Sequence, residues 1–179
     1  PCLHLKPTAE LAANGYLRLN TEVYGGPILN TWLDRPLSLA GRVALRSENT
    51  YKPELRLYNA DRPLLTIPNL AVHMNRKVNE GVELKKQSDL LPLFGLHEKE
   101  GQDAQYLLSF LAGELQCKKE DILDFDLYVY NAEEGVRVGV NQEFFSSPRL
   151  DNQTSCYALL RALMDGNRAD GINLIALYD

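Results

Sequence analysis

YLRLNTEVYGGP (residues 16–27) sets the period that most of this chain follows. Leu17 and Leu19 alternate with more polar neighbours, which is the two-residue period of a half-buried β-strand, and the glycine pair before Pro27 ends it. Further short strands are expected at residues 2–5, 28–33, 37–46, 54–58, 64–67 and 125–130. Because the strands up to residue 67 follow one another at spacings of roughly 8 to 12 residues, they favour a small β-barrel or sandwich.

One helix is expected inside this β-rich region. Apolar residues recur at helical spacing from Ala104 to Leu115, and Asp103 is well placed to cap the N-terminus of a helix over residues 103–116. Residues 77–102 are mostly polar and read as a loop.

The end of the chain follows a different pattern. Residues 153–165 carry apolar side chains along one helical face, and residues 172–178 are almost wholly apolar, as in a strand covered on both faces. A helix followed by a buried strand is typical of a parallel α/β sheet. We therefore predict an α+β fold: a small β-barrel or sandwich module with helices, joined to pieces of an α/β domain with a parallel sheet.

Composition excludes several functional classes. The net charge of −5 and the absence of Lys/Arg clusters beyond pairs argue against a nucleic-acid surface. No apolar run approaches the roughly 18–20 residues of a membrane span, so no membrane contact is expected. The three cysteines form no C-x-x-C pair, which favours free thiols in a reducing compartment and hence a cytoplasmic location. The chain starts at Pro1 without a methionine, which suggests an excised or processed piece.

The polar turn SSPRLDN (residues 146–152) carries the most specific signal. On residue types alone, Asp151 just before a helix is most simply an N-cap. Read together with residues 22–43 and 67–81, however, the motif PRLDN resembles that of the M18 family of metalloaminopeptidases, the aspartyl aminopeptidase group. The resemblance covers nearly the whole chain. It implies that Asp151 bridges two zinc ions and that the Asp151–Asn152 peptide is cis.

The two ends of the chain also resemble the family. Residues 1–3 are similar to those that follow the family's first metal-binding histidine. Residues 177–179 are similar to those that precede its paired glutamates, of which one is the general base and one a metal ligand. The resemblance therefore implies that the general base lies beyond Asp179, that no catalytic residue is in this chain, and that the chain alone binds no zinc and is inactive.

The three histidines are expected to have different roles. In similar proteins a histidine of the segment that includes His73 reaches the neighbouring subunit's active site and helps to hold substrate. A surface histidine is an equally simple interpretation of His73. His4 is expected to face solvent or to have a hydrogen-bond partner, and His97 is expected to be solvated.

The resemblance implies three parts: residues 1–6 and 143–179 as pieces of a catalytic α/β domain, and residues 7–142 as an inserted β-rich dimerisation or lid domain. It also implies a dizinc aminopeptidase that removes N-terminal residues, with acidic ones expected, from peptide substrates, and homo-oligomers built as dimers and dodecamers. The alternative is a non-catalytic β-barrel module for peptide binding or oligomerisation. An enzyme of another class is disfavoured because G-x-S-x-G and H-E-x-x-H are both missing.

Overall fold

The computed structural model of the chain describes residues 2–97 and 105–178. It divides into two compact units, Pro1–Ala132 and Glu133–Asp179, and each is described by itself. The domain boundaries expected after residues 6 and 142 fall within the first strand and between the last two strands.

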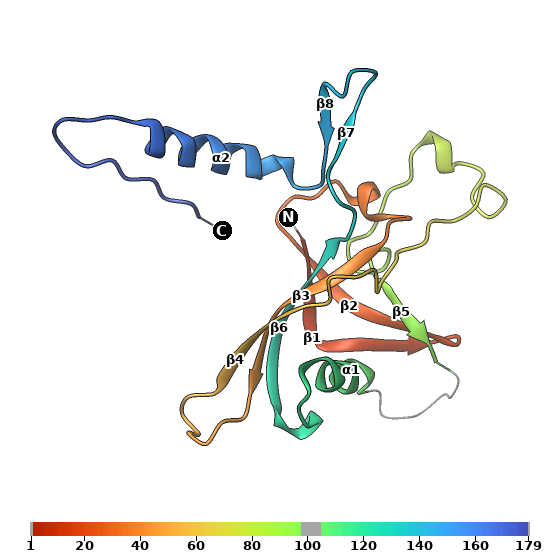
Figure 1. Cartoon of the computed structure of the whole chain (residues 1–179). Helices are drawn as coiled ribbons and strands as arrows, with labels where there is room; N and C mark the ends of the chain where they lie inside the picture. The colour runs from red at the N-terminus through yellow and green to blue at the C-terminus, as the bar shows by residue number, and fades with distance from the viewer. Residues whose placement is uncertain (1, 98–104, 179) are drawn as a thin grey trace. The chain divides into compact units, whose positions relative to one another are not determined.

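The first unit is built on one antiparallel sheet with the strand order β4-β3-β6-β1-β2-β5 (Figure 1). Residues 65 and 66 also link β3 to β5 through two isolated bridges, Leu37–Leu65 on the β3 side and Thr66–Leu93 on the β5 side. The strands are β1 (Cys2–Ala13), β2 (Tyr16–Tyr24), β3 (Leu37–Leu45), β4 (Glu54–Asn59), β5 (Leu93–Leu96) and β6 (Ile122–Asn131). The helices are α1 (Tyr106–Leu115) and the short 3-10 helices η1 (Leu29–Trp32), η2 (Val78–Glu80) and η3 (Lys119–Asp121).

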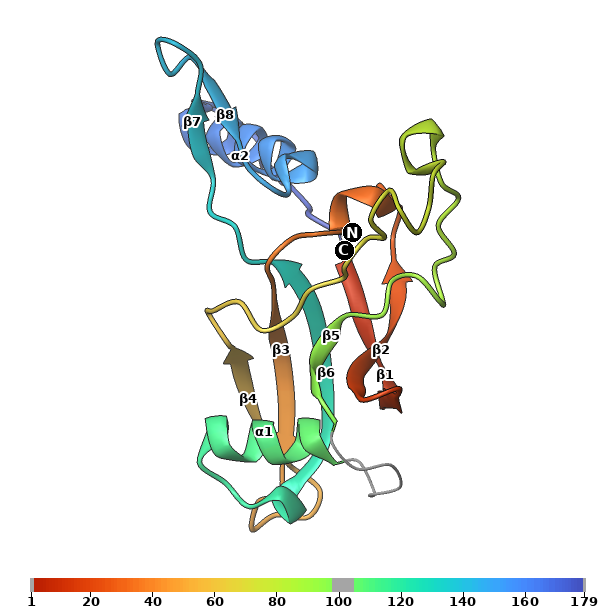
Figure 2. The same ribbon diagram turned by 90° about the vertical axis from the view of Figure 1, so that its right-hand side faces the viewer.

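Alternation along the strands places the core on one face of this sheet. Leu17 and Leu19 of β2 are buried, as their spacing predicts, and so is Thr21, whose hydroxyl donates to the Leu90 carbonyl oxygen at 2.6 Å. Helix α1 packs on the sheet and adds Leu107 and other apolar residues to the same cluster (Figure 2). The remaining fully buried large side chains are Leu3, Leu5, Leu37, Leu39, Val43, Leu90, Leu111, Leu127 and Val129.

Within the first unit, two strand predictions are wrong. Residues 28–33 form η1 instead of a strand, since both the N–H and the hydroxyl of Thr31 donate to the Ile28 carbonyl oxygen, at 3.2 and 2.7 Å. Local bonds thus satisfy groups that a strand would offer to a ladder. Residues 64–67 form two isolated bridges instead of a strand, because the backbone hydrogen bonds of residues 64–66 are divided between Leu37 of β3 and Leu93 of β5.

The helix expected over residues 103–116 is confirmed as α1. The proposed cap Asp103 lies outside the described residues. Within them, the Glu10 carboxylate of β1 accepts hydrogen bonds from the backbone N–H groups of Tyr106 and Leu107. A distant side chain therefore satisfies donors that a helix N-terminus leaves free.

The second unit contains the hairpin β7 (Val136–Val138) and β8 (Phe144–Ser146) and the helix α2 (Leu150–Asp165). The expected strand at residues 172–178 is not formed, and nearly all of this segment is exposed. A strand exists through its ladder, and no described strand pairs with this run. The pairs of the described sheets are all antiparallel, so the predicted parallel sheet is not found in the described part of the chain. No described helix has both the length and the apolar character needed to cross a bilayer.

Candidate functional site

Asp151 lies where the chain passes from β8 into α2. Arg149 has left-handed backbone angles (φ 67°, ψ 22°) and occupies the N-cap position, without a side-chain capping hydrogen bond. Asp151 and Asn152 have non-helical angles, and the peptide bond between them is cis, as the family resemblance implies. The Gln153 N–H then donates to the Arg149 carbonyl oxygen at 3.2 Å, which starts the regular helix. The N-cap interpretation of Asp151 is therefore wrong.

The Asp151 side chain is exposed and accepts no hydrogen bond from the described residues. A carboxylate in this condition is available to an external ligand, because no internal donor competes for its lone pairs. Its surroundings do not complete a metal site: the described residues contain no group of three or more His, Cys, Asp or Glu that could hold an ion. A zinc site needs about three protein ligands, so the described residues do not fit zinc by themselves.

His73 belongs to the first unit and Asp151 to the second. The His73 side chain is exposed, and its segment is held by a turn in which the Met74 N–H donates to the Ala71 carbonyl oxygen at 2.8 Å. Exposure makes the imidazole accessible to a partner. Its contact with substrate stays a prediction.

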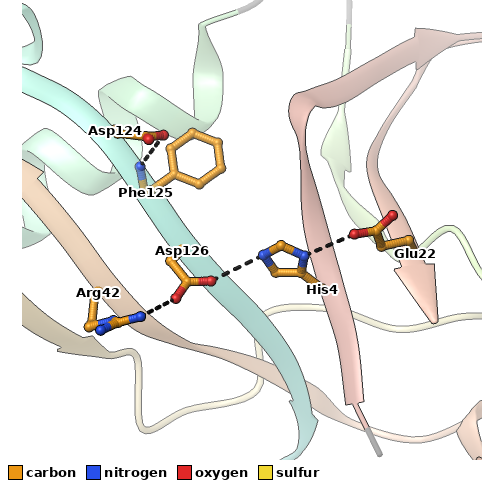
Figure 3. A network of polar contacts seen from close by, with 6 residues as sticks. All are labelled: His4, Glu22, Arg42, Asp124, Phe125 and Asp126. Atoms are coloured by element: carbon orange, nitrogen blue, oxygen red, sulfur yellow. Dashed lines mark hydrogen bonds and ion pairs between the residues drawn. The ribbon is translucent and has the colours of Figure 1, made fainter. Parts of the chain in front are cut away.

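A polar network crosses four neighbouring strands of the first unit, as Figure 3 shows. Arg42 of β3 donates to one carboxylate oxygen of Asp126 in β6 at 2.7 Å. The other oxygen lies 3.1 Å from Nε2 of His4 in β1, whose Nδ1 lies 3.1 Å from the Glu22 carboxylate in β2. The His4 ring also stacks on Tyr128, with 4.7 Å between the ring centroids. His4 thus has partners, which is one of its two expected states.

The chemistry of this network is structural. The hydrogen bond from Arg42 holds the pKa of Asp126 below its usual range, so Asp126 is ionised at neutral pH. Among the described residues, its carboxylates and imidazole do not form a metal-binding group. The sequence does not reveal it, because its members come together only through the strand register.

His97 corrects a prediction. We expect it to be solvated, yet only 7% of its surface is exposed, and its ring packs edge-on against Tyr106 with 5.4 Å between centroids. Neither ring nitrogen has a hydrogen-bond partner among the described residues. The aromatic contact with α1 buries it, and the intervening sequence gives no periodic signal for that contact.

A protein-family model described as aminopeptidase I zinc metalloprotease (M18) matches residues 1–179. The probable M18 family aminopeptidase 2 of Clostridium novyi is 46% identical over 180 residues, which cover all of this chain and 42% of that protein. Its counterpart in Ectopseudomonas mendocina is 44% identical over 169 residues, or 93% of this chain and 39% of that protein. The chain thus spans less than half the length of these relatives.

Solved structures agree on the fold. A chain of the cryo-EM structure of the Ape4 and Nbr1 complex superposes with a TM-score of 0.81 at 36% identity, covering 92% of this chain and 34% of that one. Chaetomium thermophilum mApe1 gives a TM-score of 0.77 at 27% identity, covering 94% and 40%. The S. cerevisiae mApe1 dodecamer, at 23% identity over 92% and 36%, has a TM-score of 0.69 and shows the shared fold.

Proposed function

The chain belongs to the M18 family of zinc metalloaminopeptidases, and we propose that it forms part of an enzyme that removes N-terminal residues, acidic ones by preference, from peptides. One observation carries the proposal. Asp151, in the segment that matches the family's PRLDN motif, is exposed, has no partner among the described residues and lies between the left-handed Arg149 and the start of the regular helix.

Asp151 acts in this proposal as a shared metal ligand. A carboxylate can present one oxygen to each of two metal ions. Asp151 would hold zinc together with ligands from outside this chain, and the zinc would supply an activated water for hydrolysis. The other ligands and the general base would come from parts of the enzyme that this chain does not include. The chain by itself is therefore proposed to be inactive and to hold no zinc.

The first unit is proposed to be the dimerisation or lid module. The exposed His73 lies on a turn between β4 and β5, outside the strands, and is proposed to reach a neighbouring subunit and hold a peptide group there. The dodecamer formed by S. cerevisiae mApe1 supports a homo-oligomer built from such modules. The three free cysteines suit a reducing, cytoplasmic setting.

The test replaces Asp151 in the complete enzyme. We expect Asp151→Asn to lower both the bound zinc and the turnover of an aspartyl anilide by about a hundredfold or more, since a metal ligand is lost. Asp165→Asn is the matched control, because Asp165 lies on the same helix and pairs only with Arg161 at 2.8 Å among the described residues. Full zinc content and full turnover in the Asp151 variant would refute the assignment.

Self-association separates this function from the alternative, a monomeric β-rich module that binds peptides. Light scattering on the 179-residue chain should report a dimer, and His73→Ala should leave that dimer intact while it weakens substrate binding in the complete enzyme. A monomer that binds an extended peptide would favour the alternative instead.

A further inference from the structure

A cavity of about 340 Å³ lies within the first unit. Its walls come from β2, through Arg18, from β5, through Leu93, and from the stretch of chain between residues 67 and 91. Arg18 and Leu93 are register partners, so the two strand walls are held together by the sheet. The volume is within the range of about 300–1,000 Å³ typical of small-molecule pockets.

Arg18 is the unusual group of this cavity. Its Nε is buried, and it has no hydrogen-bond partner among the described residues. No ion pair of Arg18 occurs in the described part of the chain either. A guanidinium stays charged at all ordinary pH values, and a buried donor without an acceptor is unfavourable. Arg18 therefore brings to the cavity wall a positive charge that is not paired with a carboxylate of the described residues.

Asp89 is the carboxylate that lines the same cavity. Its oxygens accept hydrogen bonds from the Lys85 N–H and the Ser88 hydroxyl, both at 2.8 Å. These bonds, the one from Lys85 first, lower the pKa of Asp89 and keep it ionised. Asp89 is thus satisfied by its own turn instead of by Arg18, and its charge opposes an anion in the cavity.

Most of the other walls are apolar. Ile67, Val82, Leu84 and Leu91 lie along the segment that faces the strands, and the polar groups among them include the side-chain amide of Asn69. Such a surface favours a branched aliphatic group through burial of apolar area. A ligand that satisfies both features carries an anionic acceptor and a small aliphatic body.

We propose that this cavity binds a carboxylate attached to a branched aliphatic group, with the carboxylate on Arg18 and the aliphatic group against Ile67, Val82 and Leu91. The ligand is either a free small acid or the C-terminal residue of a peptide, since both present this chemistry. The assignment does not depend on Asp151, because every residue that carries it lies in the first unit.

Binding is measured by NMR titration of the 179-residue chain with N-acetyl-L-leucine, and with N-acetyl-L-leucinamide as the uncharged control. We expect saturable chemical-shift changes at Arg18, Asn69 and Val82 when the acid is added. The amide should bind at least about tenfold more weakly than the acid, because the charge-assisted hydrogen bond is lost. Gly-Gly-Gly-Leu serves as the peptide probe: tighter binding than the small acid identifies a C-terminal residue as the ligand, and weaker binding a free acid.

Two variants with opposite expected signs make the test sharper. Arg18→Gln should abolish the preference for the acid, and Asp89→Asn should strengthen acid binding several-fold by removing the opposing charge. Arg76→Gln is the matched control. It removes a positive charge from the stretch between residues 67 and 91, but Arg76 does not line the cavity. The proposal would be overturned by equal affinity for acid and amide, by the absence of saturable chemical-shift changes, or by changes confined to other residues. The comparison of acid and amide uses the unaltered chain, so it remains valid even where a variant fails to fold.

Discussion

At the scale of single residues, the network from Arg42 to Glu22 connects four strands that are far apart in the sequence. Its side chains are partly exposed, with 60% of the Arg42 side chain and 34% of the Asp126 side chain open to solvent. Exposed ion pairs each contribute only about 0–1 kcal/mol. The network therefore serves more to fix which residues face one another across β3, β6, β1 and β2 than to supply the bulk of the folding free energy.

Asp126→Asn should lower the free energy of unfolding by about 1 kcal/mol at pH 7, as the contacts to Arg42 and His4 are weakened. Because the folded-state pKa of Asp126 lies below its unfolded value of about 3.9, the ionised form stabilises the fold above that pH. This stability is lost as the pH falls through the folded pKa. Thermal unfolding at pH 7 and below pH 3 should thus show the difference between the two proteins shrinking with acid.

Asp124→Asn is the control for that measurement. Asp124 lies on the same strand, but the described structure gives its carboxylate only the adjacent Phe125 N–H as donor (Figure 3). We expect little change in unfolding at either pH. A pH-independent loss in the Asp126 variant, or an equal loss in the Asp124 variant, would show that charge pairing is not the cause.

Single residues also show which parts of a candidate site can be predicted from the sequence and which cannot. Asp151 is proposed as a metal ligand from five consecutive residues, since its motif is local. The cavity that Arg18 lines cannot be predicted in this way, because Arg18 alternates in β2 like any outward residue and lines a common cavity with residues 67–91 only in the folded chain. His97 is misjudged for the same reason, as its burial comes from Tyr106.

At the scale of elements, strands are predicted correctly where apolar and polar residues alternate along a paired strand, and wrongly where no continuous ladder forms. β2 and β3 match the expected ranges closely, since their apolar residues occupy one face of a paired strand. Residues 28–33 and 64–67 are apolar enough for strands but lack a continuous ladder. Apolar content predicts burial, whereas a strand also requires a partner of matching length and register, which a single segment does not encode.

Two glycines in different elements give opposite predictions. A Cβ on Gly41 of β3 would lie 2.1 Å from the Asp126 carbonyl oxygen, so Gly41→Ala should push β3 and β6 apart and lower the free energy of unfolding by about 3 kcal/mol or more. Gly113 lies in α1, and a Cβ added there would meet no atom of the described residues within 4 Å outside the backbone of its own helix, so Gly113→Ala should raise that free energy by roughly 0.5–1 kcal/mol. Urea denaturation of both variants measures the two effects, and a tolerated alanine at position 41 would contradict the close packing of these strands.

At the scale of the whole molecule, the apolar core is confined to one unit. Every buried apolar residue of the described chain lies between residues 3 and 129. In the second unit no described residue is buried, and α2 leaves Tyr157 67% and Met164 73% exposed. An apolar surface of this kind normally marks an interaction site. The proposed place of this unit inside a larger catalytic domain accounts for it, because the neighbouring elements of that domain would cover these side chains.

The two units should therefore behave differently when they are made separately. Residues 1–132 contain the whole buried cluster and should unfold cooperatively with heat, with protected amides in β1, β3 and β6. Residues 133–179 should show no cooperative transition and no protected amides, because a helix and a hairpin without buried apolar contacts are marginal in water. Calorimetry and hydrogen exchange on the two pieces measure whether each one unfolds cooperatively and protects its amides. A cooperative transition in the second piece would mean that it has a core of its own, and it would remove the argument that the remainder of an aminopeptidase domain must cover α2.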